Sequence, residues 1–202
     1  LRYRGYDAVD TEPGGVVGDF RFGFEVGDAL RALRGRSHDL VVAQQFMDLV
    51  PLESAVDALT TAAGDGGLVY CPLTFDGVTV FQPDHPADAD VQRAYHGAIG
   101  DDADRDAYAG RHLLEEFRDR AGTLLAVDAA DAIVHPRRGE YPGDERYFLR
   151  CLLEFVEESV PVEAVPEVET WLSTRRDQVA NGRLSYVGHR YDFLYRTAAE
   201  RA

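Results

Sequence analysis

The segment 37–82 constrains the fold more than any other part of the chain. It holds two apolar runs, 40–43 and 68–71, on either side of a stretch in which Leu52, Val56 and Leu59 recur at helical spacing. This pattern predicts a strand, a helix and a second strand, which form a parallel crossover unit. Because every position of the first run is apolar, we expect that strand to be buried on both faces, with helices on each side of the sheet.

The crossover unit also predicts where a ligand site lies. In open parallel sheets, ligands bind in the crevice outside the carboxyl ends of the strands. We therefore expect Gln44, Gln45, Phe46 and the segment 72–75 to form the rim of such a crevice. Asp48 follows in the turn before the helix, where it is either a rim carboxylate or an acidic residue that favours the helix start.

The rest of the chain is predicted to alternate strands and helices around this unit. Strands are expected at 1–10, 20–26, 123–127 with 132–134, and 184–195, and the breaker at 13–15 predicts a loop. Helices are expected at 29–33, within 84–106, and at 109–121, 148–160 and 167–181. The chain is long enough for a single domain of 1–202 with helical insertions at 84–108 and 137–182, which would cover the crevice as a lid.

Composition limits the class of partner. Acidic side chains outnumber basic ones 36 to 21, which gives a formal charge of -15, and every basic residue is Arg. Nucleic-acid binding by phosphate neutralisation needs clustered positive charge, so we expect no nucleic-acid partner. The composition is typical of proteins from salt-loving archaea, whose dense carboxylate surfaces stay soluble in salt. An ordinary acidic protein from a high-GC genome is the alternative.

No feature of the sequence indicates a membrane, a metal or a disulfide. The longest apolar runs are too short for a membrane span and no signal peptide is visible, so we expect a cytoplasmic protein. Cys71 and Cys151 lie in apolar surroundings and are interpreted as buried thiols. The histidines are scattered without the spacing of metal ligands, so no metal site is predicted. The sequence leaves the oligomeric state open.

Two acids, Asp10 and Asp28, follow successive predicted strands. Carboxylates in that position can accept hydrogen bonds from ribose hydroxyls or an exocyclic amine. Together with HDLVVAQQFMDLVP, GGLVYCPLTFDGVTVFQP, AIVHPRRGEYPGDERYFLRCLLEFVEESV and GRLSYVGHRYDFLYR, these residues make the chain resemble class I S-adenosylmethionine-dependent methyltransferases. The resemblance covers nearly the whole chain.

The resemblance implies a fold, a cofactor and a reaction. The fold would be α/β, with a Rossmann-like, mostly parallel sheet between helices, an antiparallel last strand and a helical insertion near the carboxyl-terminal half. Asp10 would hold the ribose hydroxyls of S-adenosylmethionine, Asp28 would accept from the adenine amine, and the Ala29 N–H would meet the ring. Gln44, Gln45 and Phe46 would line the methionine end, where the methyl group passes to a small-molecule acceptor.

The first strand of that family and its glycine-rich turn are expected to precede Leu1. Two other interpretations therefore stay open: a non-catalytic relative or fragment that serves as an interaction module, and another nucleotide-using enzyme such as a nicotinamide-dependent reductase. His96 and Asp48 are the candidates for an acceptor contact or a base. A packing role for His96 and a turn role for Asp48 are the alternatives.

Overall fold

The computed structural model describes residues 2–7, 15–100 and 104–199, and its strands form two separate sheets. The strands are β1 (Arg2–Asp7), β2 (Gly15–Val17), β3 (Phe20–Val26), β4 (Leu40–Val42), β5 (Leu68–Gln82), β6 (Thr123–Val134) and β7 (Ser185–Arg196). The helices are α1 (Ala29–Ala32), the 3-10 turn η1 (Met47–Leu49), α2 (Leu52–Ala63), α3 (Asp88–Gly100), α4 (Ala109–Arg118), α5 (Glu145–Ser159) and α6 (Val168–Ala180).

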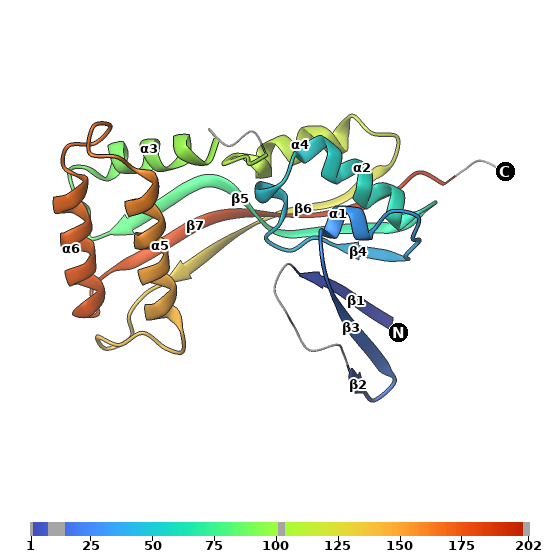
Figure 1. Cartoon of the computed structure of the whole chain (residues 1–202), viewed down its shortest axis with the longest axis horizontal. Helices are drawn as coiled ribbons and strands as arrows, with labels where there is room; N and C mark the ends of the chain where they lie inside the picture. The colour runs from blue at the N-terminus through green and yellow to red at the C-terminus, as the bar shows by residue number, and fades with distance from the viewer. Residues whose placement is uncertain (1, 8–14, 101–103, 200–202) are drawn as a thin grey trace.

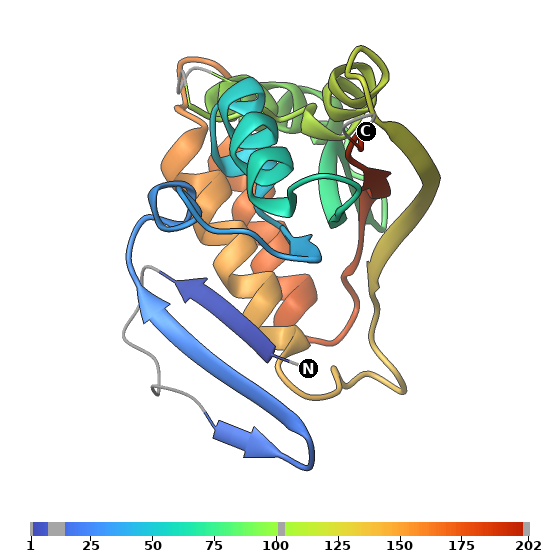
Figure 2. The same ribbon diagram turned by 90° about the vertical axis from the view of Figure 1, so that its right-hand side faces the viewer.

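The smaller sheet has the order β1-β3-β2, in which β1 is parallel to β3 and β2 is antiparallel to it. Of the expected strand 1–10, residues 2–7 are described and form β1, and Gly15, at the end of the expected loop 13–15, begins β2 because it pairs with Phe22. Both views place β1 on the side of this sheet that is nearer β4 (Figures 1 and 2). Within the described residues, β1 pairs only with β3 and β4 only with β5, so one edge of each strand is unpaired.

The larger sheet has the order β4-β5-β7-β6 and is mixed. β4 runs parallel to β5 with Leu40 opposite Leu68, and α2 connects the two strands, as the crossover pattern predicts. The last strand, β7, is antiparallel to both β5 and β6, which agrees with the predicted antiparallel final strand.

Two hydrophobic clusters hold helices against this sheet. In the first, α2 and α4 contribute buried residues that pack on Val69 of β5 and on Phe193 and Tyr195 of β7. In the second, residues of α3, α5 and α6 pack on Phe81 of β5 and Tyr186 of β7. Side chains alternate along a strand, so Tyr186 and Phe193 project from opposite faces of β7. The sheet is therefore flanked by helices, with α2 and α4 near β4 and with α5 and α6 at the far end of β5 and β7 (Figure 1).

Two expectations about the crossover strands differ from the structure. Val41 is buried, but Leu40 is 49% and Val42 is 45% exposed, so within the described chain only one face of β4 is covered. The second strand does not end at Cys71 but continues to Gln82. Pro72 interrupts it without ending it because β7 keeps pairing beyond the irregularity at 72–73, and a strand tolerates proline at a bulge.

Helices are present within both expected insertions: α3 lies in 84–108, and α5 and α6 lie in 137–182. They pack on the far ends of the long strands β5 and β7, away from β4 (Figure 1). That these segments act as a lid over a crevice stays a prediction.

Candidate functional site

The backbone is strained where β4 and the parallel part of β5 end. Gln45 has φ 49° and Leu73 has φ 58°, so two residues that are not glycine occupy the left-handed region. They are adjacent, because the Gln45 N–H donates to the Pro72 carbonyl at 3.2 Å. Each such conformation costs on the order of 1–3 kcal/mol and is typical of ligand-binding and catalytic segments. The strain therefore marks the edge of the sheet that the sequence predicts as the site.

Packing and hydrogen bonds fix this edge in place. The Ala43 N–H donates to the Tyr70 carbonyl at 2.9 Å, which extends the ladder one residue past β4. The Leu73 N–H, freed from the sheet by the bulge, donates to the Asp192 carboxylate at 2.7 Å. Gln44 and Gln45 are exposed, whereas Phe46 is half-buried and packs against the first cluster. The two amide side chains are thus free to meet a ligand while Phe46 anchors the turn.

Asp48 lies in η1, directly beyond this turn, and is half-buried. Its backbone carbonyl accepts from the Asp106 N–H at 3.1 Å, which ties η1 to the segment before α4. Burial raises the pKa of the Asp48 carboxyl above its ordinary value, although its backbone and the charges of Arg190 and Arg105 act in the opposite direction. A half-buried carboxyl with a raised pKa can accept a proton, so Asp48 has the chemistry of a base.

Tyr95 lies near Asp48, and Tyr186 lies near Tyr95 and Arg190. Burial raises the pKa of the half-buried Tyr95, on α3, and the nearby Tyr186 and Asp48 raise it further. Burial also raises the pKa of Tyr186, on β7, although Arg190 and its hydrogen bond to Tyr186 oppose this effect. These groups come from three elements, η1, α3 and β7, and together form a polar region beside the strand ends.

Arg190 and Tyr186 were not among the residues predicted for the site. The signal in the sequence is the charged Arg190 in the middle of the last predicted strand, SYVGHRYDFLYR. The sequence alone could not place Arg190 beside Leu73, because the bulges of β5 decide which part of β7 lies next to Leu73.

His96 is enclosed rather than open to an acceptor. It is only 4% exposed, and its Nε2 lies 3.1 Å from the Thr79 hydroxyl. The rings of Phe75, Tyr95 and Tyr108 lie around it at 5.6, 5.7 and 6.3 Å between centroids. Burial lowers the pKa of His96, which favours the neutral imidazole. This geometry fits the packing interpretation.

Of the two acids predicted to bind the nucleoside part of the cofactor, the structure describes only Asp28. Asp10 lies outside the described residues. Asp28 is exposed at the carboxyl end of β3 and caps α1, accepting from the Arg31 N–H at 2.9 Å. Ala29 is the first residue of α1, whose Leu30 packs against the first cluster. Asp28 and Ala29 thus sit at a strand end on the smaller sheet, and Gln44, Gln45 and Phe46 at one on the larger sheet.

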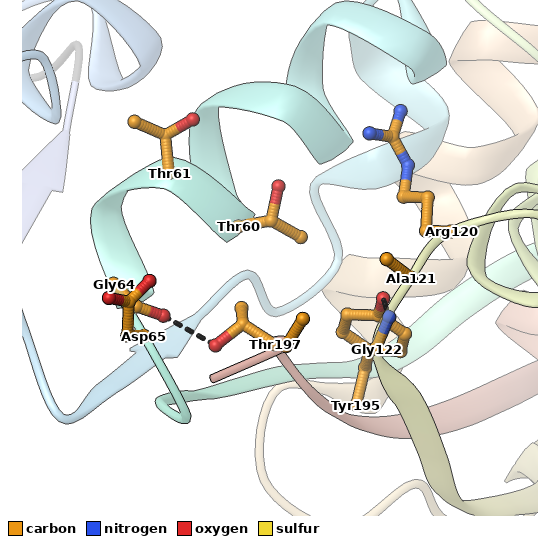
Figure 3. Close-up of a pocket in the computed structure, with 10 residues that line it drawn as sticks. Thr60, Thr61, Gly64, Asp65, Arg120, Ala121, Gly122, Tyr195 and Thr197 are labelled. Carbon is orange, nitrogen blue, oxygen red and sulfur yellow. Dashed lines mark hydrogen bonds between the residues drawn. The ribbon is translucent and has the colours of Figure 1, made fainter. Parts of the chain in front are cut away.

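A pocket of about 450 Å³ lies elsewhere, beside the amino end of β5 and the carboxyl end of β7, and Figure 3 shows the residues that line it. Arg120, Gly122 and Tyr195 line it together with residues at the end of α2, and the Gly122 N–H donates to the Tyr195 hydroxyl at 2.7 Å. Arg120 is already paired with Asp57 and Glu116. None of the predicted site residues lines this pocket.

In the described part of the chain, no three His, Cys, Asp or Glu side chains gather in a way that could hold a metal ion. None of the described helices is both long and apolar enough to cross a membrane.

Comparison with known proteins finds likeness in structure but not in sequence. No family model and no curated protein matches the chain. A Bacillus halodurans protein assigned as a methyltransferase matches with a TM-score of 0.51 and 14% identity, over 90% of this chain and 74% of that one. An Anaeromyxobacter dehalogenans protein assigned as a type II methyltransferase matches with a TM-score of 0.51 and 16% identity, over 98% and 81% of the two chains.

A third structure, a methyltransferase from Thiobacillus denitrificans in complex with S-adenosyl-L-homocysteine, matches with a TM-score of 0.39 and 16% identity, over 87% of this chain and 64% of that one. At these identities the likeness bears on the fold alone. The mixed sheet, its antiparallel last strand and the two matches above 0.5 agree on one architecture. The chain therefore has the class I S-adenosylmethionine-dependent methyltransferase fold.

Proposed function

We propose that the protein is an S-adenosylmethionine-dependent methyltransferase that acts on a small-molecule acceptor at the carboxyl ends of β4 and β5. The observation that carries the proposal is the pair of left-handed residues, Gln45 and Leu73, side by side at those strand ends. Backbone strain of this kind persists only where the surrounding structure imposes it, and it is concentrated at functional sites. The fold also supports a site at this edge, because ligands of open α/β sheets bind outside the carboxyl ends of the strands.

The described residues fit the cofactor in chemistry. Asp28 offers a carboxylate oxygen beyond the one that caps α1, which suits an exocyclic amine. The exposed amides of Gln44 and Gln45 provide donors and acceptors for an amino acid moiety. When bound, S-adenosylmethionine supplies a methyl group already activated by a positively charged sulfur.

The protein's own residues then have two tasks. The first is to hold the acceptor in line with the methyl group and to exclude water, which brings most of the rate gain in such displacements. The second arises when the accepting atom carries a proton, which must leave as the new bond to carbon forms. Asp48 is placed to take that proton, because its half-buried carboxylate is more basic than an ordinary one.

Calorimetric titration with S-adenosylmethionine tests the proposal, at the salt concentration that keeps this acidic chain folded. We expect saturable heat, and an affinity that falls by about tenfold when Asp28→Asn removes the charge but keeps a helix-capping side chain. Asp90→Asn, on the exposed surface of α3, serves as the matched control and should leave the affinity unchanged. Absence of heat in folded protein would favour the non-catalytic alternative.

A further inference from the structure

Arg190 has an incompletely satisfied guanidinium in a half-buried position on β7. Its Nη1 lies 3.5 Å from the Leu73 carbonyl, a long contact, and its side chain also hydrogen bonds with Tyr186. Its Nε is shielded from solvent and has no hydrogen-bond partner. A buried donor without a partner is destabilising, and the Nε atoms of Arg120 and Arg175 share this feature, so what distinguishes Arg190 is its charge balance.

Other shielded arginines of the described chain differ from Arg190 in one respect. Arg175 pairs with Asp88, and Arg120 pairs with Asp57 and Glu116, so each of these cations has a carboxylate. Among the described residues, no carboxylate lies within ion-pair distance of Arg190, although acids outnumber bases 36 to 21 in the sequence. Its missing anion is therefore not explained by a shortage of acids.

The groups around Arg190 do not supply that anion. Asp48, from η1, interacts with it only at longer range, because no hydrogen bond or ion pair joins the two. Asp192, two residues along β7, already accepts from the Leu73 N–H. Leu73 itself offers a neutral carbonyl. A guanidinium presents parallel N–H donors that match a planar carboxylate, so a ligand carboxylate would supply the charge that Arg190 lacks.

We propose that Arg190 binds a carboxylate group of the methyl acceptor, so that the enzyme acts on small carboxylic acids. The proposal rests on the proposed function, since it places the acceptor beside Leu73 at the strand ends. Asp48 belongs to the same polar region without pairing with Arg190, and it would take the proton from the N–H or O–H that receives the methyl group. The acceptor class is then a molecule with a carboxylate at one end and a nucleophilic nitrogen or oxygen at the other.

Ligand-observed NMR at constant ionic strength tests this assignment with three probes that share a phenyl ring: benzoate carries a carboxylate, benzamide a neutral amide and phenyl phosphate a phosphate. We expect benzoate to bind the wild type at least tenfold more tightly than benzamide and more tightly than phenyl phosphate. Arg190→Gln should weaken benzoate at least tenfold, and Arg190→Lys, which keeps the charge but not the fork, should weaken it less. Arg93→Gln, an exposed arginine of α3, is the control and should bind benzoate as the wild type does.

Three results would overturn the assignment: no preference of the wild type for benzoate over benzamide, equal benzoate binding by Arg190→Gln, or a preference for phenyl phosphate. The wild-type comparison remains decisive even if the variants do not fold. Because benzoate is titrated without cofactor, the outcome is separate from the titration with S-adenosylmethionine. Cofactor binding without benzoate selectivity refutes only the acceptor class, and benzoate selectivity without cofactor binding refutes only the methyltransferase.

Discussion

Asp88 is predicted to be the acid on which the helical part of the fold depends most. It lies at the start of α3 and accepts from the Trp171 indole N–H at 2.7 Å and from the Arg175 guanidinium, both on α6. The Arg175 side chain is completely buried, and it also donates to the Pro83 carbonyl at 2.7 Å. Replacing Asp88 by Asn would leave this buried cation without its counter-charge.

The size of the effect follows from burial. Breaking a buried ion pair from one side costs about 3–5 kcal/mol, and the lower end applies because the Asp88 side chain keeps 27% of its exposure. Asp88→Asn should therefore lower the free energy of unfolding by about 3 kcal/mol. With a urea slope of about 2 kcal/mol per molar, the midpoint should fall by about 1.5 M. Adding Arg175→Met to Asp88→Asn should recover most of the loss, because no buried charge then remains unpaired.

Urea unfolding at fixed salt, followed by Trp171 fluorescence and by circular dichroism, measures this effect. The matched control is Asp90→Asn in the same helix turn, where a 2.7 Å pair with Arg93 is largely exposed and is worth less than about 0.5 kcal/mol. The pH dependence gives a second check. Burial alone would raise the pKa of Asp88, but the hydrogen bonds from Arg175 and Trp171 lower it below its ordinary value.

The stabilisation from Asp88 is thus present above the ordinary carboxyl pKa and is lost as the pH falls through the lowered one. An Asp88→Asn midpoint within about 0.5 M of the wild type would refute the reasoning, as would equal effects at Asp88 and Asp90.

Three further predictions concern other parts of the chain. Burial raises the pKa of Asp48, so above the ordinary carboxyl pKa the ionised side chain destabilises the folded state. Asp48→Asn should therefore raise the urea midpoint at pH 7, and it should slow methyl transfer by about 100-fold because the base is lost. Gln45→Gly should relieve part of the left-handed strain and raise the free energy of unfolding by up to about 1 kcal/mol. It should also weaken cofactor binding, because the Gln45 amide is lost. A less stable variant would show that the Gln45 backbone is not strained. Burial raises the pKa of Cys71 to about 12, so a thiol reagent at pH 8 should modify Cys151 first in native protein, and equal rates would show that Cys71 is accessible.

The crossover unit could be predicted from sequence because its signals are local. Periodicity places α2, and the apolar runs place β4 and the start of β5, almost to the residue. The full length of β5 was not predictable, since Pro72 normally ends a strand and only pairing with β7 carries the chain past it. The prediction for Asp10 stays a prediction, because Asp10 lies outside the described residues.

The candidate site was predictable only in part, for a geometric reason. Residues that directly follow a strand, such as Gln44 and Gln45, inherit their place from that strand. Arg190 instead lies at the site because of how β7 pairs with β5, and β5 is irregular at two places. No local sequence pattern predicts that pairing. Burial likewise depends on distant packing: the sequence left both a base and a packing role open for His96, and the rings of Phe75 and Tyr108 enclose it.

A structure determined in the presence of S-adenosylhomocysteine tests the central claim most directly. The account predicts density for the ligand beside Gln45 and Leu73, with its adenine end toward Asp28 and its homocysteine amino acid group against Gln44 or Gln45. Density in the pocket beside Arg120 and Gly122, or no density at saturating ligand in folded protein, would contradict it.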